Sequence, residues 1–161
     1  MRRLVSPDPE TTAALGARVA ERLFEGAVVL LSGDLGAGKT CFSQGLARGL
    51  GVEGPVQSPT YVLVMEYPEA RMPLRHADLY RLDRVEEAVA LGLEERVGYD
   101  GAWVIEWSDR FPDLWPDDRL ELRFSHPPAT EPSGGRVIEA VATGPRHAAL
   151  LEAFAPAAEL T

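Results

Sequence analysis

The feature that most constrains this chain is a glycine-rich octapeptide, Gly33-Asp34-Leu35-Gly36-Ala37-Gly38-Lys39-Thr40. It fits the pattern G-x-x-x-x-G-K-[ST] of a phosphate-binding loop, or P-loop. The continuous apolar run 27–31 precedes it and predicts a buried strand. Residues 40–50 follow with apolar side chains at helical spacing, and Gly51 is placed to end that helix. This order of strand, loop and helix predicts an α/β fold with a site for nucleotide phosphates.

The residue types of the loop suit phosphate binding. Glycines let successive backbone N–H groups converge on one anion, and the start of the following helix adds positive potential there. Lys39, the only lysine in a chain rich in arginine, can reach the terminal phosphates, and the Thr40 hydroxyl is the expected Mg²⁺ ligand. The residues predicted to contact the nucleotide from this loop are Asp34, Leu35, Gly36, Ala37, Gly38, Lys39, Thr40 and Cys41.

The composition limits the remaining possibilities. A length of 161 residues predicts a single domain, 1–161, and the net charge of −9 argues against a broad nucleic-acid or anionic-membrane surface. The lone Cys41 excludes an internal disulfide framework and fits a reducing compartment. No apolar run has the length of a membrane span, and the N-terminus has no apolar signal region. We therefore expect a cytoplasmic protein.

The chain as a whole predicts a P-loop NTPase-like mixed β-sheet flanked by helices. Predicted strands cover residues 3–5, 61–67, 74–80, 102–105, 119–124 and 136–142, in addition to 27–31. Predicted helices cover residues 10–23, 83–91 with Asp83 as the cap, 93–97 and 145–154, in addition to 40–50. Strands 61–67 and 74–80 have no helix between them, which indicates an antiparallel pair and hence a mixed sheet. The tail beyond about residue 143 is expected to be helical and peripheral.

Carboxylates at strand ends are the candidates for metal binding and catalysis. Glu106 directly follows a buried strand, where a P-loop protein usually places a second acid near the metal. We predict that it binds Mg²⁺ directly, binds it through water, or polarises the attacking water. Asp78 is the second catalytic candidate, because an unpaired carboxylate in a strand is costly to bury. His76 lies on the same side of that strand, but His-x-Asp alone is a weak metal pattern. Trp107 is either a core residue or a neighbour of the nucleotide.

Four motifs taken in order resemble those of one family. They are 33–40, then Ser58-Pro59-Thr60-Tyr61, then His76-Ala77-Asp78-Leu79-Tyr80-Arg81-Leu82, then Glu106-Trp107. Together they resemble TsaE, also called YjeE, the bacterial P-loop ATPase family of the tRNA threonylcarbamoyladenosine pathway. The resemblance covers about residues 1–125. It implies MgATP binding and slow hydrolysis by an accessory protein, coupled to the TsaD–TsaB pair, which handles the tRNA.

The resemblance also implies roles for individual residues. Lys39 would hold phosphates, Thr40 and Glu106 would serve Mg²⁺, and Asp78 would join the nucleotide site. Ser58 to Thr60 would form a switch-like loop. On the same basis, the residues expected near the base are Thr12, at the start of the first helix, and the Gly135-Arg136 region.

Three other functions compete with this interpretation. A GTPase is disfavoured, because guanine selection uses an Asn-Lys-x-Asp motif and the chain contains no asparagine. A small-molecule P-loop kinase would need an acceptor pocket and an arginine-bearing lid. The chain has arginines that such a lid could use, namely Arg81, Arg84 and Arg110, but no segment of the sequence has the pattern of a lid. A nucleotide-gated binding module would use ATP binding and hardly depend on turnover.

Overall fold

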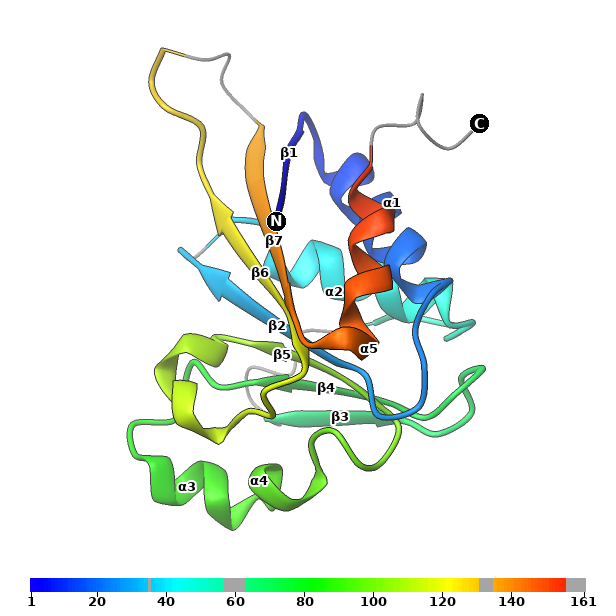
Figure 1. The fold of residues 1–161 in the computed structure, drawn as a ribbon, viewed down its shortest axis with the longest axis vertical. Helices are drawn as coiled ribbons and strands as arrows, with labels where there is room; N and C mark the ends of the chain where they lie inside the picture. Colours follow the sequence, from blue (N-terminus) through cyan, green and yellow to red (C-terminus); the bar gives the residue numbers. More distant parts are fainter. Residues whose placement is uncertain (35, 57–62, 131–134, 156–161) are drawn as a thin grey trace.

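A mixed β-sheet with helices on both faces forms the centre of the structure (Figure 1). The computed structural model describes residues 1–34, 36–56, 63–130 and 135–155. The strands are β1 (Arg2–Ser6), β2 (Val28–Gly33), β3 (Val64–Tyr67), β4 (Leu74–Asp78), β5 (Ala102–Glu106), β6 (Arg119–Ser125) and β7 (Arg136–Thr143). The α-helices are α1 (Pro9–Ala20), α2 (Lys39–Gly49), α3 (Val85–Ala90), α4 (Leu93–Arg96) and α5 (Pro145–Ala148). Short 3₁₀ helices are η1 (Ser108–Arg110), η2 (Pro112–Leu114) and η3 (Ala149–Phe154).

The predicted mixed sheet is confirmed. Within the described residues, its strand order is β1-β7-β6-β2-β5-β4-β3. The four central strands are parallel, whereas β3 pairs antiparallel with β4 and β7 pairs antiparallel with both β6 and β1. Parallel pairing brings the carboxyl ends of β2, β4 and β5 to one edge of the sheet. The P-loop follows β2 at that edge, so the strand ends predicted to carry the acids meet it there.

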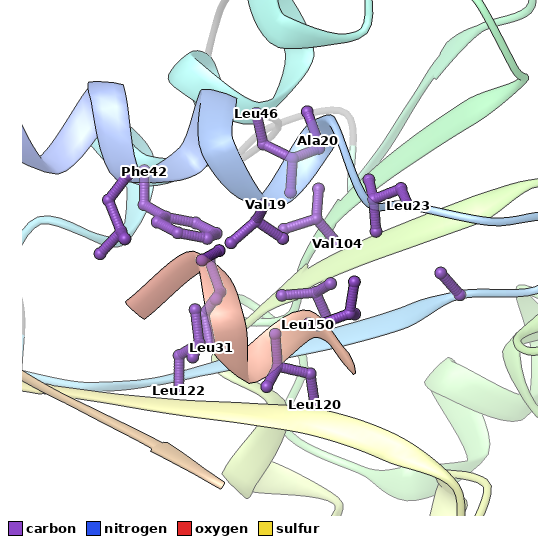
Figure 2. Close-up of a cluster of buried hydrophobic side chains, with 14 of the residues drawn as sticks. Val19, Ala20, Leu23, Leu31, Phe42, Leu46, Val104, Leu120, Leu122 and Leu150 are labelled. Carbon is purple, nitrogen blue, oxygen red and sulfur yellow. The ribbon is translucent and has the colours of Figure 1, made fainter. Parts of the chain in front are cut away.

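The central strand β2 is buried on both of its faces. Val29 and Leu31 belong to the larger core, beneath α1, α2 and η3, whereas Val28 and Leu30 belong to the core beneath α3 and α4. Figure 2 shows the larger core, in which Leu31 of β2 lies among side chains from β6, α1, α2 and η3. A continuous apolar run is what a strand covered on both faces requires. The apolar run before the P-loop therefore predicted this position correctly.

Helices α1 and α2 touch through their backbones. A Cβ added at Gly45 would lie 2.0 Å from the carbonyl oxygen of Ala13, and one added at Gly16 would lie 2.3 Å from that of Phe42. Both distances are far below van der Waals contact, so each position requires glycine. This close crossing fixes α2, the helix that begins with the P-loop lysine.

Several predicted boundaries differ from the structure. Asp8 caps α1 by accepting a hydrogen bond from the Thr11 N–H at 2.7 Å, and this helix ends at Ala20, three residues before the predicted end. The prediction that Asp83 caps α3 is wrong. Arg84 occupies the cap position, and the Glu87 carboxylate accepts hydrogen bonds from the backbone N–H groups of both residues.

Two further segments depart from expectation. Strand β3 begins at Val64, directly after Leu63, whose φ of 73° is left-handed and incompatible with a strand, while residues 61–62 lie outside the described residues. The C-terminal segment forms α5 and η3, and it places Leu150, Ala153 and Phe154 in the larger core. This segment is therefore part of the core and not the peripheral tail that was expected.

Candidate functional site

The P-loop connects the end of β2 to the start of α2. Gly33, Gly36 and Gly38 have φ values of 131°, 75° and 104°, a range in which side chains other than glycine are strained. Gly33 has an additional constraint, because a Cβ there would lie 2.1 Å from the carbonyl oxygen of Phe124 on β6. Leu35, one of the predicted phosphate contacts, lies outside the described residues. The described glycines therefore give the loop the curled backbone that the sequence predicts.

Lys39, the first residue of α2, points back over the loop. Its Nζ donates hydrogen bonds to the carbonyl oxygens of Gly33 at 2.6 Å and Asp34 at 2.8 Å, and it lies 4.1 Å from the centre of the Trp107 ring. Burial lowers the pKa of the Lys39 ammonium, and the negative charges of Glu106, Asp109, Asp78 and Asp34 oppose that shift. In this structure the Lys39 ammonium interacts with two carbonyl oxygens and the face of the Trp107 ring. A phosphate at the loop would give it a stronger, oppositely charged partner.

Glu106 lies at the end of β5 and is 1% exposed. Its Oε1 accepts a hydrogen bond from the Thr40 Oγ at 2.9 Å, and its Oε2 lies 2.5 Å from Nε2 of His76. Strand register explains this meeting, since Glu106 pairs with Leu31 of β2 on one side and with Asp78 of β4 on the other. The structure thus brings the two predicted magnesium ligands, Thr40 and Glu106, into contact.

These two groups fit Mg²⁺ better than they fit a transition metal. Mg²⁺ prefers oxygen ligands, keeps several waters, and is commonly held by one or two protein groups together with substrate phosphates. Thr40 and Glu106 supply one hydroxyl and one carboxylate 2.9 Å apart, next to the P-loop. Among the described residues, no group of three or more His, Cys, Asp or Glu side chains is arranged to hold a metal ion. The donor set therefore suits a magnesium ion that arrives with a nucleotide.

Asp78 is buried at the end of β4, beside Glu106 in the sheet register. Its Oδ1 accepts a hydrogen bond from the Tyr80 backbone N–H at 2.9 Å, so this oxygen stabilises the turn that follows β4. A cavity of about 310 Å³ opens between the P-loop and these strand ends. The residues lining it are Gly36, Ala37, Gly38, Lys39, Thr40, Cys41, Asp78, Tyr80, Glu106 and Trp107. The sequence predicted all of these for the site except Tyr80 and Trp107. It left the position of Trp107 undecided between the core and the nucleotide.

Thr12 and Arg136 lie on the other side of the P-loop. Arg136 donates hydrogen bonds from Nε at 3.3 Å and Nη2 at 3.2 Å to the carbonyl oxygen of Gly36. The Thr12 hydroxyl contacts that of Ser6 at 2.7 Å. A second hollow of about 200 Å³ lies here, and Asp8, Pro9, Thr12, Gly36, Gly38, Cys41 and Arg136 line it. Thr12 and Arg136, which the resemblance implies to be near the base, thus lie close to the loop but outside the cavity that holds Lys39 and Glu106.

Cys41 borders both hollows. Its thiol donates a hydrogen bond to the Pro9 carbonyl oxygen at 3.0 Å, and burial raises the pKa of the thiol. A raised pKa disfavours the nucleophilic thiolate. Cys41 therefore ties the start of α2 to the start of α1, which agrees with packing as its main role.

Three residues of the site were not among the predicted site residues. Trp107 has a φ of 59° and packs beside Tyr80 with ring centroids 5.0 Å apart, and His76 is buried against Glu106. The sequence signals for these residues are the motifs 76–82 and Glu106-Trp107, which contain all three. The position of His76 follows from strand register, which the sequence does not give. The predicted switch segment Ser58–Thr60 lies outside the described residues.

A family model for "Threonylcarbamoyl adenosine biosynthesis protein TsaE" matches residues 6–133. The chain belongs to the TsaE family. This matched range includes the P-loop, His76, Asp78, Glu106 and Trp107.

Individual relatives agree with this assignment. A "tRNA threonylcarbamoyladenosine biosynthesis protein TsaE" from Nostoc sp. is 45% identical over 118 residues, covering 70% of this chain and 71% of the relative. The protein of that name from Bacillus subtilis is 37% identical over 145 residues, which cover 90% of this chain and 88% of the relative. The crystal structure of Bacillus subtilis YdiB superimposes with a TM-score of 0.78 at 31% identity, covering 93% of this chain and 90% of that one. The chain is thus similar in sequence to TsaE proteins and similar in fold to YdiB.

Proposed function

We propose that this TsaE-family chain binds MgATP at its P-loop and hydrolyses it slowly, as an accessory protein in threonylcarbamoyl modification of tRNA adenosine. One observation carries the nucleotide part of the proposal. Thr40, at the start of α2, and Glu106, at the end of β5, meet at 2.9 Å directly beside Lys39 and the P-loop. An oxygen pair next to a phosphate cradle is the arrangement that a nucleotide-bound magnesium requires.

The residues have distinct roles in this proposal. Backbone N–H groups of residues 36–40 and the Lys39 ammonium bind the phosphates, while Thr40 and Glu106 hold Mg²⁺. The metal, when bound, neutralises charge on the phosphate oxygens. Asp78 and Glu106 are the groups available to orient the attacking water, since both are buried carboxylates lining the same cavity. Thr12 and Arg136 border the loop on the side proposed for the base.

The proposed partners are those that the resemblance to TsaE implies. The names of the relatives refer to biosynthesis of tRNA threonylcarbamoyladenosine. A net charge of −9 disfavours strong binding of this chain alone to a polyanion. We therefore propose that the chain acts with the TsaD–TsaB complex and that tRNA is contacted mainly through that complex. No helix among the described residues combines the length and the apolar character needed to cross a membrane.

Phosphate release from MgATP tests the proposal, measured for the chain alone and with purified TsaB and TsaD. We expect slow release that rises sharply with both partners, and modified tRNA only when all components are present. Lys39→Ala should abolish release and modification. Arg48→Ala, which removes an exposed cation from the same helix, is the matched control and should leave both unchanged. Release that ignores the partners would contradict the coupled ATPase, and transfer of phosphate to an added small acceptor would favour the kinase instead.

A further inference from the structure

His76 lies beneath the site, in the middle of β4. Its side chain is 1% exposed and faces the same side of the sheet as Asp78, two residues further on. In the register of β4 with β5, His76 pairs with Val104, so Glu106 is its diagonal neighbour across the strands. The imidazole spans this diagonal and brings Nε2 to 2.5 Å from Oε2 of Glu106. The two side chains therefore meet on the buried side of the site.

We propose that His76 is a positioning residue that presents Glu106 to the magnesium ion. It donates its Nε2–H to one carboxylate oxygen, which turns the other oxygen toward Thr40. The inference rests on the proposed function, because it assigns to His76 a role toward the metal of that same site.

The hydrogen bonds of Glu106 carry the argument. Oε1 accepts from the Thr40 hydroxyl at 2.9 Å and Oε2 contacts His76, so each oxygen has a different partner. A buried carboxylate is stable only when its oxygens are hydrogen-bonded. A bound cation would take Oε1 and the hydroxyl oxygen of Thr40, leaving Oε2 with His76. The histidine contact is therefore compatible with a bound metal and fixes the rotamer of the ligand in advance.

The geometry also specifies which ring nitrogen carries the proton. A carboxylate accepts hydrogen bonds, so Nε2 must be protonated to bond with it. Within the described part of the chain, no group forms a hydrogen bond with Nδ1 of His76. With the proton on Nε2, the ring makes its hydrogen bond to Glu106, and the buried Nδ1 without a partner is an acceptor. With the proton on Nδ1, a buried N–H donor would lack a partner.

A purely packed histidine would have the same burial, so replacements must separate packing from hydrogen bonding. His76→Gln places an amide N–H near the position of Nε2 and keeps the donor to Glu106. His76→Asn is also polar, but its shorter amide ends near the position of Nδ1. His76→Leu keeps an apolar side chain of similar size without any donor.

The measurement is the magnesium concentration that gives half of the ATP-induced rise in melting temperature, at a fixed saturating ATP concentration. We expect His76→Leu and His76→Asn to need about 10- to 100-fold more Mg²⁺ than the wild type, the usual cost of losing a hydrogen-bond partner of a metal ligand. His76→Gln should stay within about threefold of the wild type. ATP binding without Mg²⁺ should be equal in all four proteins. An unchanged magnesium requirement in His76→Leu, or equal losses in the Gln and Asn variants, would overturn the inference.

A coupled pair of variants sharpens the test. In a Glu106→Ala background there is no carboxylate to position, so adding His76→Leu should not change the magnesium requirement further. A further loss in that background would show that His76 acts elsewhere and would refute the proposal. If the wild type itself binds no nucleotide, the proposed function fails and this inference fails with it. Normal wild-type binding combined with an insensitive His76→Leu would refute the inference alone.

One measurement needs no substitution, and it remains informative if the variants fold poorly. Nitrogen NMR of the imidazole ring in the unmodified protein at neutral pH reports which nitrogen is protonated. We expect Nε2 of His76 to carry a proton. A proton on Nδ1 alone would contradict the hydrogen bond to Glu106.

Discussion

Replacing Gly45 by alanine tests the close packing that fixes α2 beneath the nucleotide site. The added Cβ would lie 2.0 Å from the Ala13 carbonyl oxygen, and 2.6 Å from both the Cα and the carbonyl carbon of Ala13. Carbon and oxygen atoms normally approach no closer than about 3.3 Å, so α1 and α2 must separate by roughly 1.3 Å. The obstructing atoms are backbone, and a change of rotamer cannot remove the clash.

Two opposing effects set the size of the change in stability. Overpacking a buried contact costs about 1–3 kcal/mol, and a clash this close with backbone atoms belongs in the upper part of that range, about 2–3 kcal/mol. Alanine favours a helix interior over glycine by about 1 kcal/mol, which offsets part of this cost. A net loss of about 1–2 kcal/mol follows, and for a domain of this size each kcal/mol lowers the melting temperature by roughly 2–4 °C. We therefore expect the Gly45→Ala melting temperature to fall by about 2–8 °C.

Thermal unfolding followed by circular dichroism measures this directly. Arg48→Ala, on the exposed side of the same helix, is the control and should change the stability by less than about 0.5 kcal/mol. A Gly45→Ala protein that melts at or above the wild-type temperature would refute the backbone contact between the two helices. The gain in helix propensity would then be the only effect of the substitution.

Three further predictions concern a buried histidine, an aromatic ring and tRNA. Burial lowers the pKa of His147, whose Nε2 accepts a hydrogen bond from the Val28 N–H at 2.9 Å, so the unfolded chain takes up the proton first. The contribution of neutral His147 to the free energy of unfolding should be fully present above about pH 6.5 and should be lost as the pH falls below it. In urea unfolding, His147→Gln should reduce the fall of the unfolding free energy with decreasing pH, whereas the exposed-residue control His126→Gln should not. Equal pH dependence in the two variants would contradict the assignment of this loss to His147. Trp107→Phe should remove most of the tryptophan fluorescence response to ATP while calorimetric binding persists, because Trp107 lines the cavity; an undiminished response would show that another tryptophan reports the nucleotide. The chain alone should bind tRNA weakly at physiological salt, and a tight, salt-sensitive complex in a filter assay would contradict this.

The sequence predicted the parts of the site that local rules control. The P-loop pattern, the buried strand before it and the carboxylates at two strand ends depend on neighbouring residues and hydrophobic runs. The mixed sheet followed from two strands without a helix between them. These features place Lys39, Thr40, Asp78 and Glu106 around one cavity.

What the sequence could not supply depends on contacts between distant segments. His76 meets Glu106 only through the register of β4 with β5, and no local pattern encodes that register. The cap of α3 was assigned to Asp83 by residue type, yet the Glu87 side chain supplies the hydrogen bonds at this terminus. The C-terminal segment was predicted to be helical and peripheral, yet it delivers Leu150 and its neighbours to the core.

A titration of the Lys39→Ala protein with ATP tests the central claim most directly, because the whole account depends on phosphate binding at this loop. Calorimetry with and without Mg²⁺ should show saturable, one-to-one binding by the wild type. Loss of a charged hydrogen-bond donor of about 3 kcal/mol predicts affinity about 100-fold weaker in Lys39→Ala, with the Arg48→Ala control unchanged. Unchanged ATP affinity in Lys39→Ala would contradict the assignment of the P-loop as the nucleotide site.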